Sequence, residues 1–158
     1  MRTDKQWEGF VFPKALRTFS PRLQRDIVKF DFTPPKEDPD KPGSFFLYGA
    51  ANTGKTTLAA QMFLAALKRR YYVKLQCTYI WTTSYDFFTA LRKTYDDPKL
   101  SEETVMDSYV NAAQLYLDDL GDIKITDWGL SQLQVLINKR YELLLPMVIT
   151  SNLSLQEL

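Results

Sequence analysis

The feature that constrains the fold most is a glycine-bounded loop placed between an apolar run and a helical run. Residues 49–57 read GAANTGKTT, which satisfies the spacing G-x-x-x-x-G-K-[ST]. The apolar run 45–48 precedes the loop, and we predict it to be a strand. Glycines allow the backbone to turn tightly, so that successive N–H groups point inward and the next helix presents its positive end to an anion. The motif therefore predicts a phosphate-binding loop (P-loop).

Two side chains of this loop are expected to have roles of their own. Lys55 would bridge the β- and γ-phosphates of a bound nucleotide, and the hydroxyl of Thr56 would bind Mg²⁺. An ordinary turn between a strand and a helix is the alternative, and the flanking strand and helix favour the P-loop. The predicted nucleotide-binding residues are Gly49, Ala50, Ala51, Asn52, Thr53, Gly54, Lys55, Thr56 and Thr57.

A second signal is an apolar run that ends in two adjacent acids. Residues 114–120 read QLYLDDL, and Gly121 follows. Paired carboxylates repel each other and need a cation or solvent to offset the cost. We therefore expect Asp118 to hold Mg²⁺ and Asp119 to orient or deprotonate an attacking water. An exposed strand end that leads into a turn is the alternative.

A third signal is the apolar run 146–150, which ends in Ser151 and Asn152. Asn152 is the candidate for contacting a γ-phosphate or the lytic water, and an Asx turn that closes the strand is the alternative. Because parallel α/β sheets bind ligands at the carboxyl ends of their strands, the phosphate, metal and sensing groups are expected at one edge.

Strand and helix patterns alternate along the chain from residue 45 onward. This alternation predicts an α/β fold in which a parallel sheet is sandwiched between helices. The predicted strands are 45–48, 73–81, 114–120 and 147–151, and the predicted helices are 55–70, 84–95, 101–112 and 127–145. We divide the chain into an N-terminal extension with a Pro-rich linker, 1–44, and a P-loop core, 45–158.

Composition excludes several kinds of chemistry. The chain has 158 residues, no histidine and one cysteine, which excludes a His-containing zinc site and a Ser-His or Cys-His nucleophilic pair. Its net charge is +1, so any contact with nucleic acid must be a local patch. No apolar stretch approaches the roughly 18 residues of a membrane span and no secretory signal is visible, so we expect a cytoplasmic protein without a membrane partner.

Two basic and aromatic segments have open interpretations. Residues 1–30, with Trp7, Phe10, Phe12 and Phe19, would either dock a partner or pack on the core. Residues 68–74, KRRYYVK, combine four cations with two tyrosines. They would either track phosphates and stack bases, or complement a helix end and begin a strand.

The set GAANTGKTT, LYLDDLG, WGLSQLQVLINKRYE and VITSNLSLQEL resembles the AAA+ ATPases of the DnaC/DnaI helicase-loader and IstB transposition-helper group, over residues 43–158. The resemblance implies an ATP-controlled protein that binds single-stranded DNA, self-associates through its ATPase core and places a hexameric replicative helicase on DNA. It also implies that Lys55 and Thr56 are Walker A residues, that Asp118 and Asp119 are the Walker B pair, and that Asn152 is sensor 1.

The resemblance leaves the hydrolytic step open. In the family, a segment beyond the last matched strand carries an arginine finger, whereas this sequence stops at Leu158, so we expect the C-terminal lid to be missing. Arg140 is a possible substitute, although a structural role suits its helix better. The alternatives to a loader are an IstB-like transposition helper, a viral superfamily 3 helicase and a nucleotide-gated adaptor that does not hydrolyse ATP.

Overall fold

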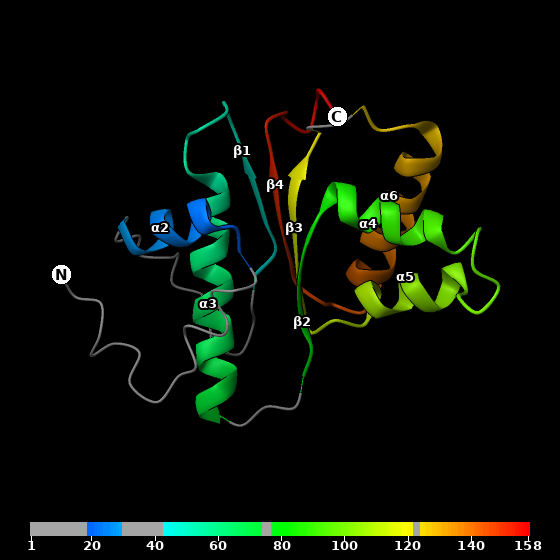
Figure 1. Cartoon of the computed structure of the whole chain (residues 1–158), viewed down its shortest axis with the longest axis horizontal. Helices are drawn as coiled ribbons and strands as arrows, with labels where there is room; N and C mark the ends of the chain where they lie inside the picture. Colours follow the sequence, from blue (N-terminus) through cyan, green and yellow to red (C-terminus); the bar gives the residue numbers. More distant parts are fainter. Residues whose placement is uncertain (1–18, 30–42, 74–76, 122–123) are drawn as a thin grey trace.

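A four-stranded parallel sheet lies between two layers of helices (Figure 1). The computed structural model describes residues 19–29, 43–73, 77–121 and 124–158. The strands stand in the order β1-β4-β3-β2, and every neighbouring pair is parallel. The elements are α2 (Pro21–Lys29), β1 (Phe45–Tyr48), α3 (Lys55–Val73), β2 (Tyr79–Thr83), α4 (Ser84–Lys93), α5 (Glu102–Val110), β3 (Gln114–Leu120), α6 (Asp127–Glu142) and β4 (Met147–Ser151). The predicted α/β architecture is confirmed.

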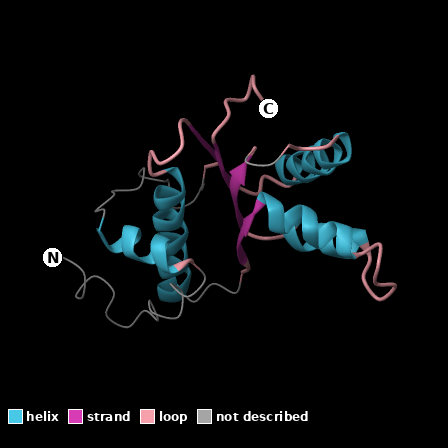
Figure 2. Ribbon diagram, turned by 45° about the horizontal axis from the view of Figure 1, so that its top comes forward, coloured by secondary structure: helices cyan, strands magenta, loops and turns pink. Residues whose placement is uncertain are grey.

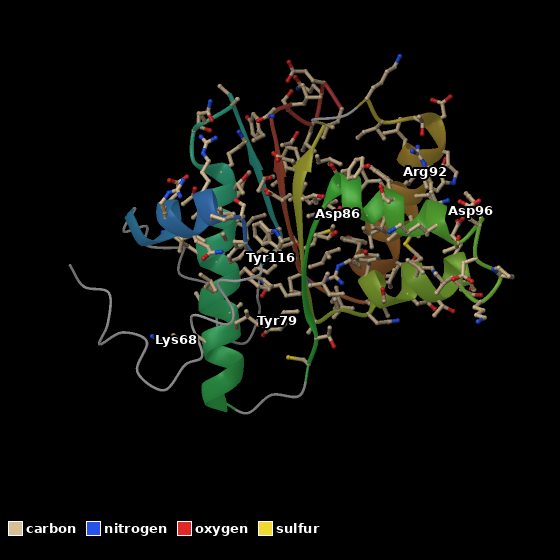
Figure 3. All side chains as sticks on the ribbon, viewed as in Figure 1. Lys68, Tyr79, Asp86, Arg92, Asp96 and Tyr116 are labelled. Atoms are coloured by element: carbon tan, nitrogen blue, oxygen red, sulfur yellow. The ribbon has the colours of Figure 1, made fainter. Side chains whose placement is uncertain are left out.

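The two central strands, β3 and β4, are apolar on both faces because helices cover both faces. Figure 2 shows α2 and α3 on one side of the sheet and the other helices on the opposite side. Tyr116 and Val148 face α3 and belong to one core cluster, and Figure 3 shows Tyr116 between the sheet and that helix. Leu115, Leu117 and Ile149 belong to the second cluster, with α4, α5 and α6. Residues of β3 thus alternate between the two faces of the sheet as far as Leu117.

Helix α2 joins part of the N-terminal extension to the core. Ser20 precedes Pro21, and its hydroxyl accepts a 3.3 Å hydrogen bond from the backbone N–H of Leu23, as suits a helix that begins with proline. Phe19 and Ile27 are buried in the cluster that contains α3. The described part of the extension therefore packs on the core. Trp7, Phe10, Phe12 and nearly all of the Pro-rich segment lie outside the described residues.

Several predicted boundaries were wrong. Helix α3 continues to Val73, so the two tyrosines of the basic segment 68–74 lie in a helix rather than opening a strand. Strand β2 begins only at Tyr79 and runs on to Thr83. Strand β2 lies where Tyr79, Ile80 and Trp81 pack against the two core clusters. The side chains of residues 69–76 lie outside the described part.

The helices on the other face are shorter than predicted. Helix α4 ends at Lys93, α5 spans Glu102–Val110, and α6 ends at Glu142. Leu144 has a positive φ of 54°, which stops α6 before Leu145. Among the described residues, no helix combines the length and apolarity that crossing a membrane requires.

Candidate nucleotide-binding site

The predicted P-loop connects the carboxyl end of β1 to the first residue of α3. Gly49 and Gly54 have φ values of 145° and 90°, and Asn52 has a φ of 63°. Glycine adopts such angles without strain, and asparagine tolerates them better than most residues. A Cβ atom added at Gly54 would meet nothing within 4 Å. The space beside the loop is therefore open, as binding a phosphate chain requires.

Lys55 closes the loop with its own side chain. Its Nζ donates hydrogen bonds of 2.8 Å to the carbonyls of Gly49 and Ala50. Helices α4, α5 and α6 each carry an acid in the first turn, whereas α3 has none. An acid there would compete with an anion for the positive helix end. The start of α3 and Lys55 thus present positive charge to the open side of the loop.

Asp118, at the acidic end of β3, contacts the P-loop. Thr56 Oγ1 donates a 3.0 Å hydrogen bond to Asp118 Oδ1, although the two residues are 62 positions apart. Thr150 Oγ1 donates a 2.5 Å bond to the same oxygen. Burial raises the pKa of the Asp118 carboxyl above its usual range, the charge of Asp119 raises it further, and the Thr150 and Thr56 hydroxyls oppose the rise. The site therefore disfavours an uncompensated carboxylate.

Asp119 is less buried and has an unusual backbone. Its φ is +59°, and the pairing of β3 with β4 is irregular between Leu117 and Leu120. The backbone N–H of Asp119 donates a 2.9 Å hydrogen bond to Thr150 Oγ1. Its carbonyl accepts a 2.7 Å bond from Ser84 Oγ. Both acids thus lie at the carboxyl end of β3, at the same edge of the parallel sheet as the P-loop (Figure 1).

Asn152 follows β4 and is half-buried. Between described residues, no hydrogen bond joins Asn152 to Asp118 or Thr56. The β4 side chain that contacts the acidic pair is Thr150, two positions earlier. Sequence reasoning missed Thr150 and Ser84. The available signal was weak: one hydroxyl residue lies directly after β2 and another lies within β4.

Arg140 is buried in the core, with only 1% of its surface exposed. Its Nη1 lies within hydrogen-bond distance of the carbonyls of Tyr109, Val110 and Ala112, at 2.8, 2.9 and 2.7 Å, and Nη2 bonds the carbonyl of Pro146. Burial lowers its pKa to about 10, so it stays charged at neutral pH. A guanidinium held in this way has no freedom to reach a neighbouring chain.

The oxygens near the loop suit a hard divalent cation. The Thr56 hydroxyl and the Asp118 carboxylate are in contact, and Mg²⁺ is commonly held by one or two such protein oxygens while it keeps several waters. Within the described ranges, no group of three or more His, Cys, Asp or Glu side chains is placed so that it could hold a metal ion. The donor set therefore fits a cation that arrives with a phosphate chain better than a closed protein cage.

Solved structures with the same fold come from DNA replication. The DnaC helicase loader is 25% identical, with a TM-score of 0.59 over 98% of this chain and 83% of that one. DnaI is 22% identical, with a TM-score of 0.59 over 93% and 78%. The initiator DnaA bound to AMPPCP and single-stranded DNA is 22% identical, with a TM-score of 0.63 over 94% and 44%. The chain thus spans less than half the length of that DnaA.

No curated protein matches the chain. The family of IstB-like ATP binding proteins matches residues 14–158, which include the P-loop, the acidic pair and all four strands. The sheet and its flanking helices have the P-loop AAA+ fold of DnaC and DnaA. The chain therefore belongs to the IstB-like ATP binding proteins, within the DnaC, DnaI and IstB group of AAA+ proteins.

Proposed function

We propose that this chain binds ATP with Mg²⁺ at the P-loop and hydrolyses it in a self-associated state. The observation that carries the proposal is the 3.0 Å hydrogen bond from Thr56 to Asp118. This hydrogen bond places the carboxylate expected to bind Mg²⁺ next to the loop expected to bind phosphates. A hydroxyl and a carboxylate are the residue types that these roles require.

In this proposal, each side chain has a separate task. Lys55 exchanges its contacts with the loop carbonyls for the β- and γ-phosphates, to which an ammonium group donates well. Thr56 and Asp118 hold the cation, which neutralises charge on the phosphates when it is bound. Asp119 orients the attacking water and accepts its proton, and Asn152 contacts the γ-phosphate or that water. The N–H groups of the loop fix the phosphate chain.

We further propose that the ATP state controls a DNA-replication partner. The likeness to the DnaC helicase loader supports a loader that places a hexameric replicative helicase on single-stranded DNA. The DnaA structure that contains single-stranded DNA supports the DNA as a ligand. The family match favours a second candidate, a transposition helper whose partner is a transposase. The ATP site is the same in both.

Nucleotide binding is tested with a fluorescent ATP analogue and Mg²⁺. Lys55→Ala should weaken binding at least about 100-fold, because it removes the cation that faces the phosphates. Lys68→Ala is the matched control, since Lys68 lies on the same helix far from the loop (Figure 3). Lys55→Ala with unchanged affinity would overturn the assignment of the loop.

Hydrolysis is tested by measuring Mg-ATP turnover against protein concentration, with and without single-stranded DNA. Turnover per chain should rise with concentration if neighbouring chains complete each other's sites. If ATP binds but is not hydrolysed under any condition, the proposed ATPase activity is wrong, and the chain is better explained as a nucleotide-gated adaptor. Capture of a replicative helicase, but not a transposase, by the ATP-bound chain would support the loader; the reverse result would support the transposition helper.

A further inference from the structure

The acidic pair lies in a bulge of the sheet. Leu117 pairs with Ile149, and the next pair is Leu120 with Ser151. Two residues of β3, Asp118 and Asp119, therefore stand opposite one residue of β4, Thr150. An extra residue of this kind re-aims side chains at the end of a strand, and bulges are common beside active sites.

The bulge changes which face of the sheet each side chain uses. Leu117 packs with the α4, α5 and α6 cluster, and Leu120 packs with the same cluster. In a regular strand, residues 117 and 120 would point to opposite faces, and Asp119 would enter the apolar cluster in place of Leu120. The bulge keeps Leu120 buried and removes Asp119 from that face. Asp118 and Asp119 can then both act at the carboxyl end of β3.

Two buried hydroxyls hold the backbone of Asp119 in this conformation. Thr150 and Ser84 are only 1% and 2% exposed. Thr150 accepts from the Asp119 N–H at 2.9 Å, and Ser84 donates to the Asp119 carbonyl at 2.7 Å. These backbone groups sit where the regular ladder is interrupted, and a buried backbone group requires a partner. One hydroxyl thus comes from each side of β3: Ser84 begins α4 directly after β2, and Thr150 lies within β4.

The Thr150 hydroxyl also fixes Asp118. It has one proton, which it donates to Asp118 Oδ1 at 2.5 Å while it accepts from Asp119. Thr56 donates to the same Asp118 oxygen. One chain of hydrogen bonds therefore joins Thr56 of the P-loop, the Asp118 carboxylate and, through Thr150, the backbone of Asp119.

We propose that Thr150 and Ser84 are positioning residues that clamp Asp119 in its left-handed conformation and so set the direction of its carboxylate. The proposal rests on the proposed role of Asp119 in handling the attacking water. Asp is among the residues that tolerate positive φ best, which explains how one residue supplies both the turn and the carboxylate.

The test compares Thr150→Val, which keeps the shape and loses the hydroxyl, with Thr150→Ser, which keeps the hydroxyl. Thr150→Val should lower kcat by about 10- to 100-fold, whereas Thr150→Ser should stay within about threefold of the wild type. Ser84→Ala should lower kcat in the same direction. Thr94→Val is the matched control, because Thr94 is a buried threonine whose hydroxyl bonds the Leu91 carbonyl away from the acids.

A second readout does not depend on hydrolysis. Crystal structures of Thr150→Val and Thr150→Ser would give the Asp119 backbone directly. Asp119 should leave positive φ in Thr150→Val and keep it in Thr150→Ser. A Thr150→Val chain in which Asp119 stays left-handed overturns the clamp, and so does an unchanged kcat. A wild-type chain that never hydrolyses ATP would refute the proposed ATPase role, and the Asp119 backbone alone would then decide on the clamp.

Discussion

Arg140 and Ala112 are 28 positions apart, and the guanidinium Nη1 of Arg140 lies 2.7 Å from the Ala112 carbonyl. The same group bonds the carbonyls of Tyr109 and Val110, in the last turn of α5, and that of Pro146, just before β4. Arg140 thus satisfies carbonyls that the end of a helix leaves open and ties them to the starts of both central strands.

We expect Arg140→Met to lower the free energy of unfolding by about 3 kcal/mol or more, because it leaves several buried carbonyls without a donor. Urea unfolding followed by circular dichroism measures this. Arg92→Met is the control, since Arg92 is exposed and its guanidinium lies 5.1 Å from the Trp128 ring centre, a contact of about 1 kcal/mol at most. If Arg140→Met were as stable as the wild type yet lost turnover in the assembly, a role as an arginine finger would be revived.

We expect Asp118→Asn to raise the stability of the nucleotide-free protein and to abolish Mg²⁺-dependent binding of ATP. Asn keeps an oxygen that accepts from Thr56 and Thr150, and it removes a buried charge that no cation offsets. Thermal unfolding with and without Mg-ATP measures both effects, and each 1 kcal/mol shifts Tm by about 2–4 °C for a chain of this size. A lower Tm without nucleotide would show that the charge itself stabilises the fold.

The stability gap between Asp118→Asn and the wild type should depend on pH. Burial raises the folded-state pKa of Asp118 above its ordinary value of 3.8. The stability that protonation contributes is therefore fully present below 3.8 and is lost as the pH rises through the folded-state pKa. The stability advantage of Asp118→Asn over the wild type should therefore increase between pH 3.8 and the folded-state pKa of Asp118. Above that pKa it should stay constant. Unfolding free energies of both chains across this range test the sign, and a gap that narrows with rising pH would contradict it.

The sequence predicted the site best where long apolar runs end sharply. The bounds of β3 and β4 match those predicted, because both strands are buried on both faces. Ser101 caps α5, a position that serine favours, and its hydroxyl accepts a 3.2 Å hydrogen bond from the Thr104 N–H. The end of α3 could not be predicted, since Tyr71 to Val73 favour strands locally but continue the helix.

The bulge in β3 also could not be predicted from the sequence. Nothing in the letters LYLDDLG distinguishes a regular strand end from one in which two acids face one threonine. Register is set by pairing with β4, which is a tertiary contact. Helix α2, by contrast, could have been found, because Ser20 followed by Pro21 is a usual way to begin a helix.

Gly121, the residue after β3, gives a last prediction about the acidic strand end. Its φ is +92°, and a Cβ added there would lie 2.9 Å from Leu153 Cδ1 and 3.4 Å from Leu158 Cδ2. Gly121→Ala should therefore cost about 1–3 kcal/mol of stability through backbone strain and crowding. Gly43→Ala is the control, because a Cβ there would meet only the Phe45 ring, at 3.4 Å. Urea unfolding of the two variants measures the difference. Because Gly121 lies only two residues after Asp119, ATP turnover by Gly121→Ala should fall as well, and turnover at the wild-type rate would show that the acids hold their position without this turn.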